Sequence, residues 1–255
     1  MNKHLVYCLL ILSFSWSASA QSKAPQKVTT DIDPLALQVV KAATDPIKDA
    51  KAFSFRAMVS RDELGTNGQT ITVFSTGEIT MQRPNKLHVR FRGRGEPVEL
   101  FFDGSGKTVF YSPSAKFYTT VSTPAGIEAT FDAMAKRGVS IATRTFLEND
   151  PYKSLTDGLI TGYGVGKVDL FDQKVYHLAF TEPGAEWQLW VVGDDKPVVR
   201  RLEVIDTSKP HHPRTTIDFF DWNFSPATSD AMFTFSKPAD AHEIEMLKLT
   251  AERTK

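Results

Sequence analysis

The clearest indication of the fold of this chain is the segment Phe53-Ser54-Phe55-Arg56-Ala57-Met58-Val59-Ser60. Phenylalanine, alanine and valine occupy every second position, and serine, arginine and methionine lie between them. Because side chains along a β-strand point alternately to its two faces, this period of two predicts a strand that is buried on one face only. The chain therefore enters a β-sheet at residue 52.

The same period continues on both sides of a central interruption. Turn sequences such as Thr66-Asn67-Gly68 separate the runs, since Asn and Gly tolerate positive φ. Short strands joined by such tight turns are typical of one antiparallel sheet. After the strand that begins at residue 52, we expect strands at 70–82, 87–92, 98–102, 107–111, 117–121, 159–169, 174–181, 186–192, 198–206 and 215–222.

Helical patterns lie before, between and after these strands. Asp33-Pro34 opens a helix that ends near Ala50, because Asp caps free amides and Pro suits the first turn. Pro124–Arg137 carries apolar residues at helical spacing and stops at a glycine, and Ile141–Asn149 predicts a second short helix that ends before a proline. The tail from Asp240 to Lys255 is expected to form a charged helix.

These elements predict a mainly β (α+β) fold. About eleven twisted antiparallel strands curl into an open half-barrel, and the helices lie across its concave face. Neither an internal repeat nor a linker divides the chain. The expected organisation is a signal peptide at 1–20, a flexible leader at 21–30, the half-barrel domain at 31–238 and a charged tail at 239–255.

The first twenty residues have the layout of a secretory signal peptide. Lys3 precedes an apolar run from Leu5 to Phe14, and small residues precede a cleavage site between Ala20 and Gln21. The run is too short to span a bilayer, which needs about 20 apolar residues. Cleavage also removes Cys8, the one cysteine of the chain, so the exported protein has neither a thiol nor a lipidated anchor.

The charge balance excludes one class of partner. The sequence holds 30 basic and 30 acidic residues, and the signal peptide takes away one lysine and no acid. Nucleic-acid-binding proteins usually show a strongly basic face, so we expect no nucleic-acid partner.

Four short motifs carry a resemblance to a known family. The motifs are Arg83-Pro84-Asn85-Lys86-Leu87, Phe102-Asp103-Gly104, Trp187-Gln188-Leu189-Trp190 and Pro197-Val198-Val199-Arg200-Arg201-Leu202. With them the chain resembles an uncharacterised family of predicted periplasmic proteins, a domain of unknown function that is similar to the LolA/LolB superfamily of lipoprotein carriers. The resemblance covers roughly residues 31–238 and implies a periplasmic protein, an incomplete barrel of about eleven strands and helices that plug a hydrophobic cavity. In the carriers that cavity holds acyl chains, and no catalytic residues come with the family.

Large apolar side chains are the most useful functional signal. The sequence has 18 Phe, and a small barrel held partly open leaves a lipid-sized space between such side chains. We expect a non-enzymatic binding protein that holds a lipid, an acyl chain or another apolar ligand, with an envelope protein as a further partner. The alternatives are an interaction module with a filled core and, third, a hydrolase. The candidate lining residues, each of which could equally be ordinary core, are Phe101, Ile127, Phe131, Met134, Trp187 and Leu189.

Arg90, Arg92 and Arg94 alternate along one predicted strand face. They fit either an ordinary exposed polar face or a basic rim that attracts an acidic headgroup or partner.

Other patterns that suggest chemistry have simpler explanations. The glycines of Gly162–Lys167 lie between strands, whereas a phosphate-binding loop needs a following helix. His211-His212 fits a solvated loop better than a metal site, because adjacent strand residues point to opposite faces. Asp218 and Asp221 fit surface carboxylates better than a glycosidase pair. We therefore expect no metal, cofactor or catalytic residues.

Overall fold

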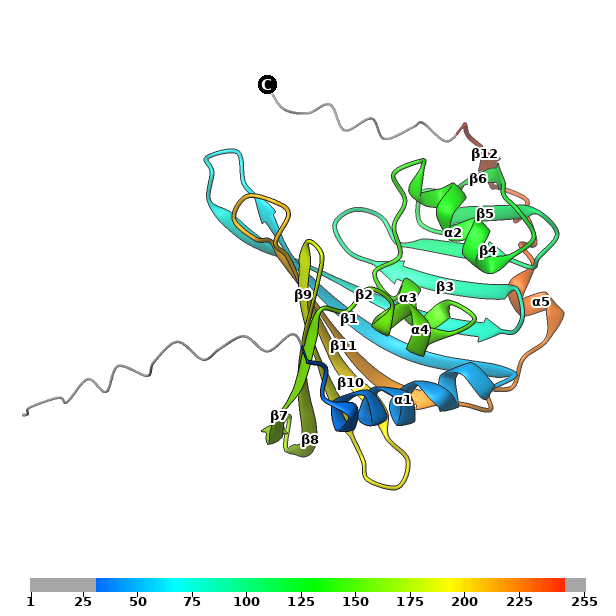
Figure 1. The fold of residues 1–255 in the computed structure, drawn as a ribbon. Coiled ribbons are helices and arrows are strands. Elements are labelled where there is room, and N and C mark those ends of the chain that lie inside the picture. Colours follow the sequence, from blue (N-terminus) through cyan, green and yellow to red (C-terminus); the bar gives the residue numbers. More distant parts are fainter. Residues whose placement is uncertain (1–30, 246–255) are drawn as a thin grey trace, which may run out of the picture.

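The computed structural model describes residues 31–245, and these residues form one twelve-stranded sheet with most of the helices on one face. The predicted mainly β fold class is confirmed (Figure 1). The predicted signal peptide, its cleavage between Ala20 and Gln21, and the leader 21–30 lie outside the described residues. Among residues 31–245, no helix is both long and apolar enough to cross a membrane.

The first half of the sheet is an antiparallel meander that runs outward from the centre. The predicted strands of this half are found within a few residues of their expected ends. Its strands are β1 (Ala52–Leu64), β2 (Thr70–Gln82), β3 (Lys86–Arg92), β4 (Val98–Phe102), β5 (Lys107–Ser112) and β6 (Phe117–Ser122).

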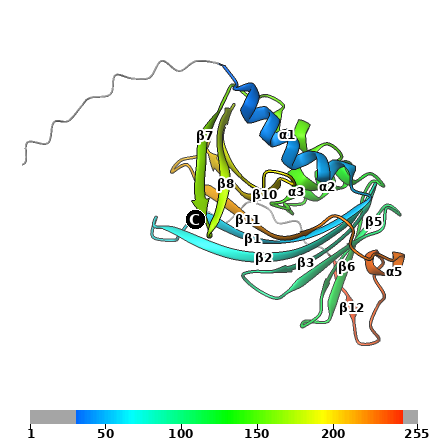
Figure 2. The ribbon, with the colours of Figure 1, turned by 90° about the horizontal axis from the view of Figure 1, so that it is seen from below.

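The second half is another antiparallel meander, which returns to the first strand. β1 pairs with both β2 and β11, so the strand that begins the sheet in sequence lies near its middle in space. Figure 2 shows the sheet curving into an open half-barrel. The strands of this half are β7 (Thr161–Leu170), β8 (Gln173–Glu182), β9 (Ala185–Val192), β10 (Val198–Asp206) and β11 (Arg214–Asn223).

A twelfth strand corrects the prediction for the tail. Residues His242–Glu243 form β12, which pairs in parallel with β6, so a helix there is wrong. The reason is the backbone: the amides of His242 and Ile244 each donate to carbonyl oxygens of the β6 region at 2.9 Å. Residues 246–255 of the tail lie outside the described part of the chain.

The helix α1 (Pro34–Asp49) crosses the concave face of the second half (Figure 2). The carboxylate of Asp33 accepts a hydrogen bond from the Leu35 amide at 2.9 Å, which confirms the predicted cap. Its buried stripe of Ala36, Val40, Ala43 and Ile47 is the face that packs on the sheet. This helix therefore closes one half of the half-barrel.

The central insertion differs from the prediction at its second helix. The structure has α2 (Ile127–Ala135), the short α3 (Arg144–Leu147) and α4 (Pro151–Thr156). Pro151, expected to follow a helix end, instead begins α4, because the Asp150 carboxylate caps it by accepting from the Lys153 amide at 3.0 Å.

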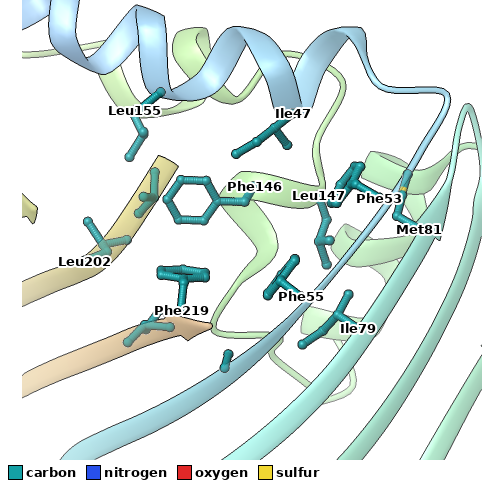
Figure 3. Close-up of a cluster of buried hydrophobic side chains, with 14 of the residues drawn as sticks. Ile47, Phe53, Phe55, Ile79, Met81, Phe146, Leu147, Leu155, Leu202 and Phe219 are labelled. Atoms are coloured by element: carbon teal, nitrogen blue, oxygen red, sulfur yellow. The ribbon is translucent and has the colours of Figure 1, made fainter. Parts of the chain in front are cut away.

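The core lies between the sheet and these helices (Figure 3). Phe146 of α3 points down onto the sheet, where its ring meets that of Phe219 edge to face at 4.9 Å. Phe55 and Phe219 lie on neighbouring strands, with their ring centres 5.5 Å apart. Aromatic side chains therefore fill the space beneath α1 and α3.

The chain after β11 covers part of the convex face. The short α5 (Asp230–Phe233) and the residues after it pass over β3 to β6. The ring of Phe235 lies 5.6 Å from Phe101, 5.2 Å from Tyr111 and 5.1 Å from Tyr118. These aromatic contacts fix the C-terminal segment to the side of the sheet opposite the helices.

Candidate functional site

The concave face is hollow where α1 does not cover it. A cavity of about 590 Å³ lies between β1 to β5 and residues 138–143, the segment that joins α2 to α3. This volume falls within the range of about 300–1,000 Å³ that small-molecule sites occupy. The cavity is the candidate functional site.

Small residues in the sheet floor create the hollow. Ala57 of β1 and Gly77 of β2 lie directly opposite each other in the strand register, and Ser75, two residues before Gly77, lies on the same face. Strand neighbours on one face normally fill the space above them with side chains. These three floor positions carry at most two side-chain heavy atoms each, so little side-chain volume rises from them, although Ile79 Cδ1 would lie 3.1 Å from a Cβ at Gly77.

Apolar side chains form the rest of the wall. The strands contribute Ile79, Val89 and Leu100, which are buried, and Phe110, which is half-buried. The roof comes from Val139, Ile141 and Ala142, all half-buried in the α2–α3 segment. A lining of this kind favours an apolar ligand, because burial of apolar surface is the main source of its binding energy.

Exposure increases steadily along the cavity floor. On the concave face of β1, Ala57 is buried, Val59 is half-buried and Arg61 is exposed. On β3, Val89 is buried and Phe91 is exposed in the same direction. Four residues of strand span about 13 Å, so the cavity has a closed apolar end and an open end roughly that far away.

All the charged residues that line the cavity lie at its open end. They are Arg61 and Glu63 on β1 and Arg94, which follows β3. Arg94 Nη1 lies 3.4 Å from Glu63 Oε2, and both side chains are partly exposed. The cavity thus has an apolar interior and a charged opening. We call these three charged residues the rim.

The predicted lining residues lie elsewhere. Ile127, Phe131 and Met134 of α2 are buried in the core, and the guanidinium of Arg144 lies 5.7 Å from the Phe131 ring centre. Trp187 and Leu189 are buried on β9, where the Trp187 ring stacks on Phe180 at 4.2 Å. None of these residues borders the cavity described above.

Phe101 lies on the opposite face of the sheet from the cavity. Its neighbours in β4, Leu100 and Phe102, are buried on the concave side, so alternation turns Phe101 outward. There it stacks on His88 at 4.7 Å and contacts Phe235 at 5.6 Å. The inward face of this strand could not be chosen from the sequence, since three successive residues, Leu100 to Phe102, are large and apolar.

The three arginines of the predicted basic rim are separated by the fold. Arg90 points to the convex face, where its guanidinium lies 3.4 Å from the Glu78 carboxylate. Arg92, two residues later in β3, is exposed and does not border the cavity. Only Arg94 reaches the cavity, because the chain leaves β3 before this residue.

The other motifs fall in structural roles. Residues 162–167 lie within β7, where a bulge occurs between Gly164 and Gly166. His211 and His212 adopt positive φ in the turn before β11. Asp218 is buried, so the expectation of a surface carboxylate is wrong there, and its carboxylate accepts two hydrogen bonds from the Arg201 guanidinium, at 2.8 and 3.0 Å. Within residues 31–245 no group of three or more metal-ligating side chains comes together.

Sequence comparison identifies the family. The chain matches the family model described as "predicted periplasmic protein (DUF2092)" over residues 36–247. The protein therefore belongs to this family of predicted periplasmic proteins, as the resemblance of its motifs indicated. Among curated proteins, none matches the sequence.

Several solved structures are similar to this one. LppX, a lipoprotein of Mycobacterium tuberculosis, is 12% identical with a TM-score of 0.48, and the match covers 77% of this chain and 98% of LppX. LprF of Mycobacterium bovis is 12% identical with a TM-score of 0.47, and the match covers 83% of this chain and 99% of LprF. A LolA superfamily protein of Nitrosomonas europaea is 10% identical with a TM-score of 0.34, and the match covers 78% of this chain and 97% of that protein. Because these sequence identities and TM-scores are low, the ligand of this chain is inferred from its own cavity.

Proposed function

We propose that this protein is a periplasmic, non-enzymatic binding protein that holds a lipid, an acyl chain or another apolar ligand in the concave cavity. The observation that carries the proposal is the unfilled space of about 590 Å³ between β1 to β5 and residues 138–143, with Ala57 and Gly77 among its lining. A core that served stability alone would be close-packed at this place, as it is beneath α1.

The proposed mechanism is burial without covalent chemistry. Each methylene group that moves from water into the cavity gains about 0.8 kcal/mol, so a long chain binds tightly without any specific contact. The ligand enters with its tail first through the open end, beside Phe91 and Val73. The roof segment 138–143 is the part that must shift to admit a chain of larger cross-section.

Membership of a predicted periplasmic family and the signal-peptide pattern of residues 1–20 support an exported location. A protein partner in the envelope, to deliver or receive the ligand, belongs to this proposal as an expectation.

Fluorescence of the neutral dye N-phenyl-1-naphthylamine tests the proposal. The wild-type protein should enhance the dye emission at a single site, and a fatty acid or lipid extract should displace the dye. Ala57→Leu fills the floor of the cavity and should reduce dye binding at least tenfold. Ala179→Leu makes the same change on β8, outside the cavity, and should leave dye binding unaltered.

Two results would overturn the proposal. The first is a folded wild-type protein that gives no change in dye emission, which would favour an interaction module with a filled core. The second is equal loss of binding in Ala57→Leu and Ala179→Leu, which would place the dye elsewhere. Circular dichroism of both variants checks that the sheet is intact.

A further inference from the structure

We infer that the ligand of the cavity is an anionic amphiphile, whose charged headgroup binds Arg61 and Arg94 at the rim while its tail lies in the apolar interior. This inference rests on the proposed function and adds the headgroup chemistry. The cavity is asymmetric, because its interior carries no charge and all three charged lining residues lie together at the opening.

The rim has an excess of positive charge. Arg94 faces Glu63 at 3.4 Å, which balances one arginine with one carboxylate. Within residues 31–245, Arg61 makes no ion pair, although it borders the same opening. The guanidinium of Arg61 is therefore available to a ligand, and its side chain is exposed to solvent, where it can contact a headgroup.

The strand register brings this charge into line with the apolar floor. Ala57, Val59 and Arg61 point to the same face of β1, so the guanidinium follows the floor residues at strand spacing. A molecule lying along this face meets apolar surface first and a guanidinium at its end. An anionic headgroup with a single tail matches that order, whereas a cationic headgroup would face Arg61 directly.

Arginine suits this role because its planar guanidinium can donate two parallel hydrogen bonds to a carboxylate or a phosphate. Glu63 has the opposite effect, since it repels an anion and occupies Arg94. Headgroup preference is therefore set by competition between the ligand and Glu63 for Arg94, together with direct pairing to Arg61.

Displacement of N-phenyl-1-naphthylamine by matched twelve-carbon amphiphiles tests the inference. The probes are dodecanoate, dodecyl phosphate, dodecanol and dodecyltrimethylammonium, each below its micelle concentration at pH 7.5. We expect one or both anions to bind more tightly than the alcohol, and the cation to bind most weakly. Comparison of the two anions distinguishes a carboxylate from a phosphate headgroup.

The variants identify the residues that give this preference. Arg61→Gln and Arg94→Gln should each weaken the anions by about two- to fivefold, the range of exposed ion pairs, and leave dodecanol unchanged. Glu63→Gln should strengthen the anions. Arg92→Gln removes the same charge from the end of β3 outside the cavity and should change nothing. Added salt should reduce the preference, since charges at an exposed rim are screened.

The outcomes separate this inference from the proposed function. If all four probes displace the dye equally, or if Arg61→Gln and Arg92→Gln behave alike, the cavity binds apolar tails and the headgroup assignment is wrong. If the dye does not bind the wild-type protein at all, the proposed function fails and the headgroup assignment fails with it.

Discussion

The two halves of the concave face are built from one sheet but are filled differently. Beneath α1 and α3, aromatic side chains such as Phe146 and Phe219 interlock, and each is at most 1% exposed. Over β1 to β5, the floor is made by Ala57, Gly77 and Ser75, and about 590 Å³ stays open. The sheet supplies the curvature in both halves, and side-chain size decides which half is filled.

This difference shows how a single fold separates stability from binding. The filled half gains stability from close packing, which has no room for a ligand. The hollow half gives up part of that packing and keeps apolar surface that a ligand can cover. Substitutions of the same type should therefore have different consequences in the two halves.

The largest expected effect is loss of a filled-half aromatic residue. Phe146→Ala should lower the free energy of unfolding by about 3–5 kcal/mol, because the fully buried ring leaves a void. Ile141→Ala, in the roof of the hollow half, should lower it by only about 1 kcal/mol, since one side of this residue already faces open space. Urea unfolding measures both values, and equal losses would contradict the comparison.

Enlarging an alanine should change the free energy of unfolding by an intermediate amount, and the change should differ between the two halves. Ala43→Leu inserts three carbons into the packed face of α1 and should destabilise the protein by about 1–3 kcal/mol. Ala57→Leu extends into the cavity, so the free energy of unfolding should change by less than about 1 kcal/mol while dye binding is lost. Thermal unfolding followed with and without dye checks both results. A strongly destabilised Ala57→Leu would show that the space is not available.

A smaller effect is expected at the cap of α4, which belongs to the filled half. Asp150→Ala should cost about 1 kcal/mol, because the Lys153 amide loses its acceptor. The hydrogen bond from Lys48 and the backbone amide of Lys153 lower the pKa of Asp150 below its ordinary value. This carboxylate therefore stabilises the fold above the ordinary aspartate pKa of about 3.9, and the contribution is lost as pH falls through the lower pKa of the folded state.

Asp150→Asn separates the two contributions at this cap. Asparagine keeps the acceptor for the backbone amide but cannot ionise, so this variant should retain most of the stability near pH 7. The difference in unfolding free energy between wild type and Asp150→Asn should shrink toward zero as pH falls from 5 to 2. A difference that stays constant across this range would show that the charge of Asp150 does not contribute.

Much of the fold could be predicted from local patterns, because alternation and turn chemistry act over a few residues. β2, β4 and β10 begin and end at the predicted residues, and Asp33 caps α1 as expected. Pro151 misled the prediction, since proline is equally suited to follow one helix and to begin the next.

The cavity could not be predicted because it depends on register. Ala57 and Gly77 are twenty positions apart in the sequence, and only the pairing of β1 with β2 places them side by side. The sequence offered one usable signal: a glycine inside a strand often marks an unfilled or closely approached position. Large residues such as Phe131 and Trp187 were the predicted lining instead, and they are buried in the core because they are large.

Native mass spectrometry of the protein, isolated without denaturation from the cells that produce it, shows whether the cavity holds a ligand. Wild-type protein should carry a bound apolar molecule, recovered by lipid extraction, and Ala57→Leu prepared in the same way should carry far less. A wild-type protein without any bound mass that also binds no apolar dye, or a bound molecule retained equally by Ala57→Leu, would contradict the proposed function.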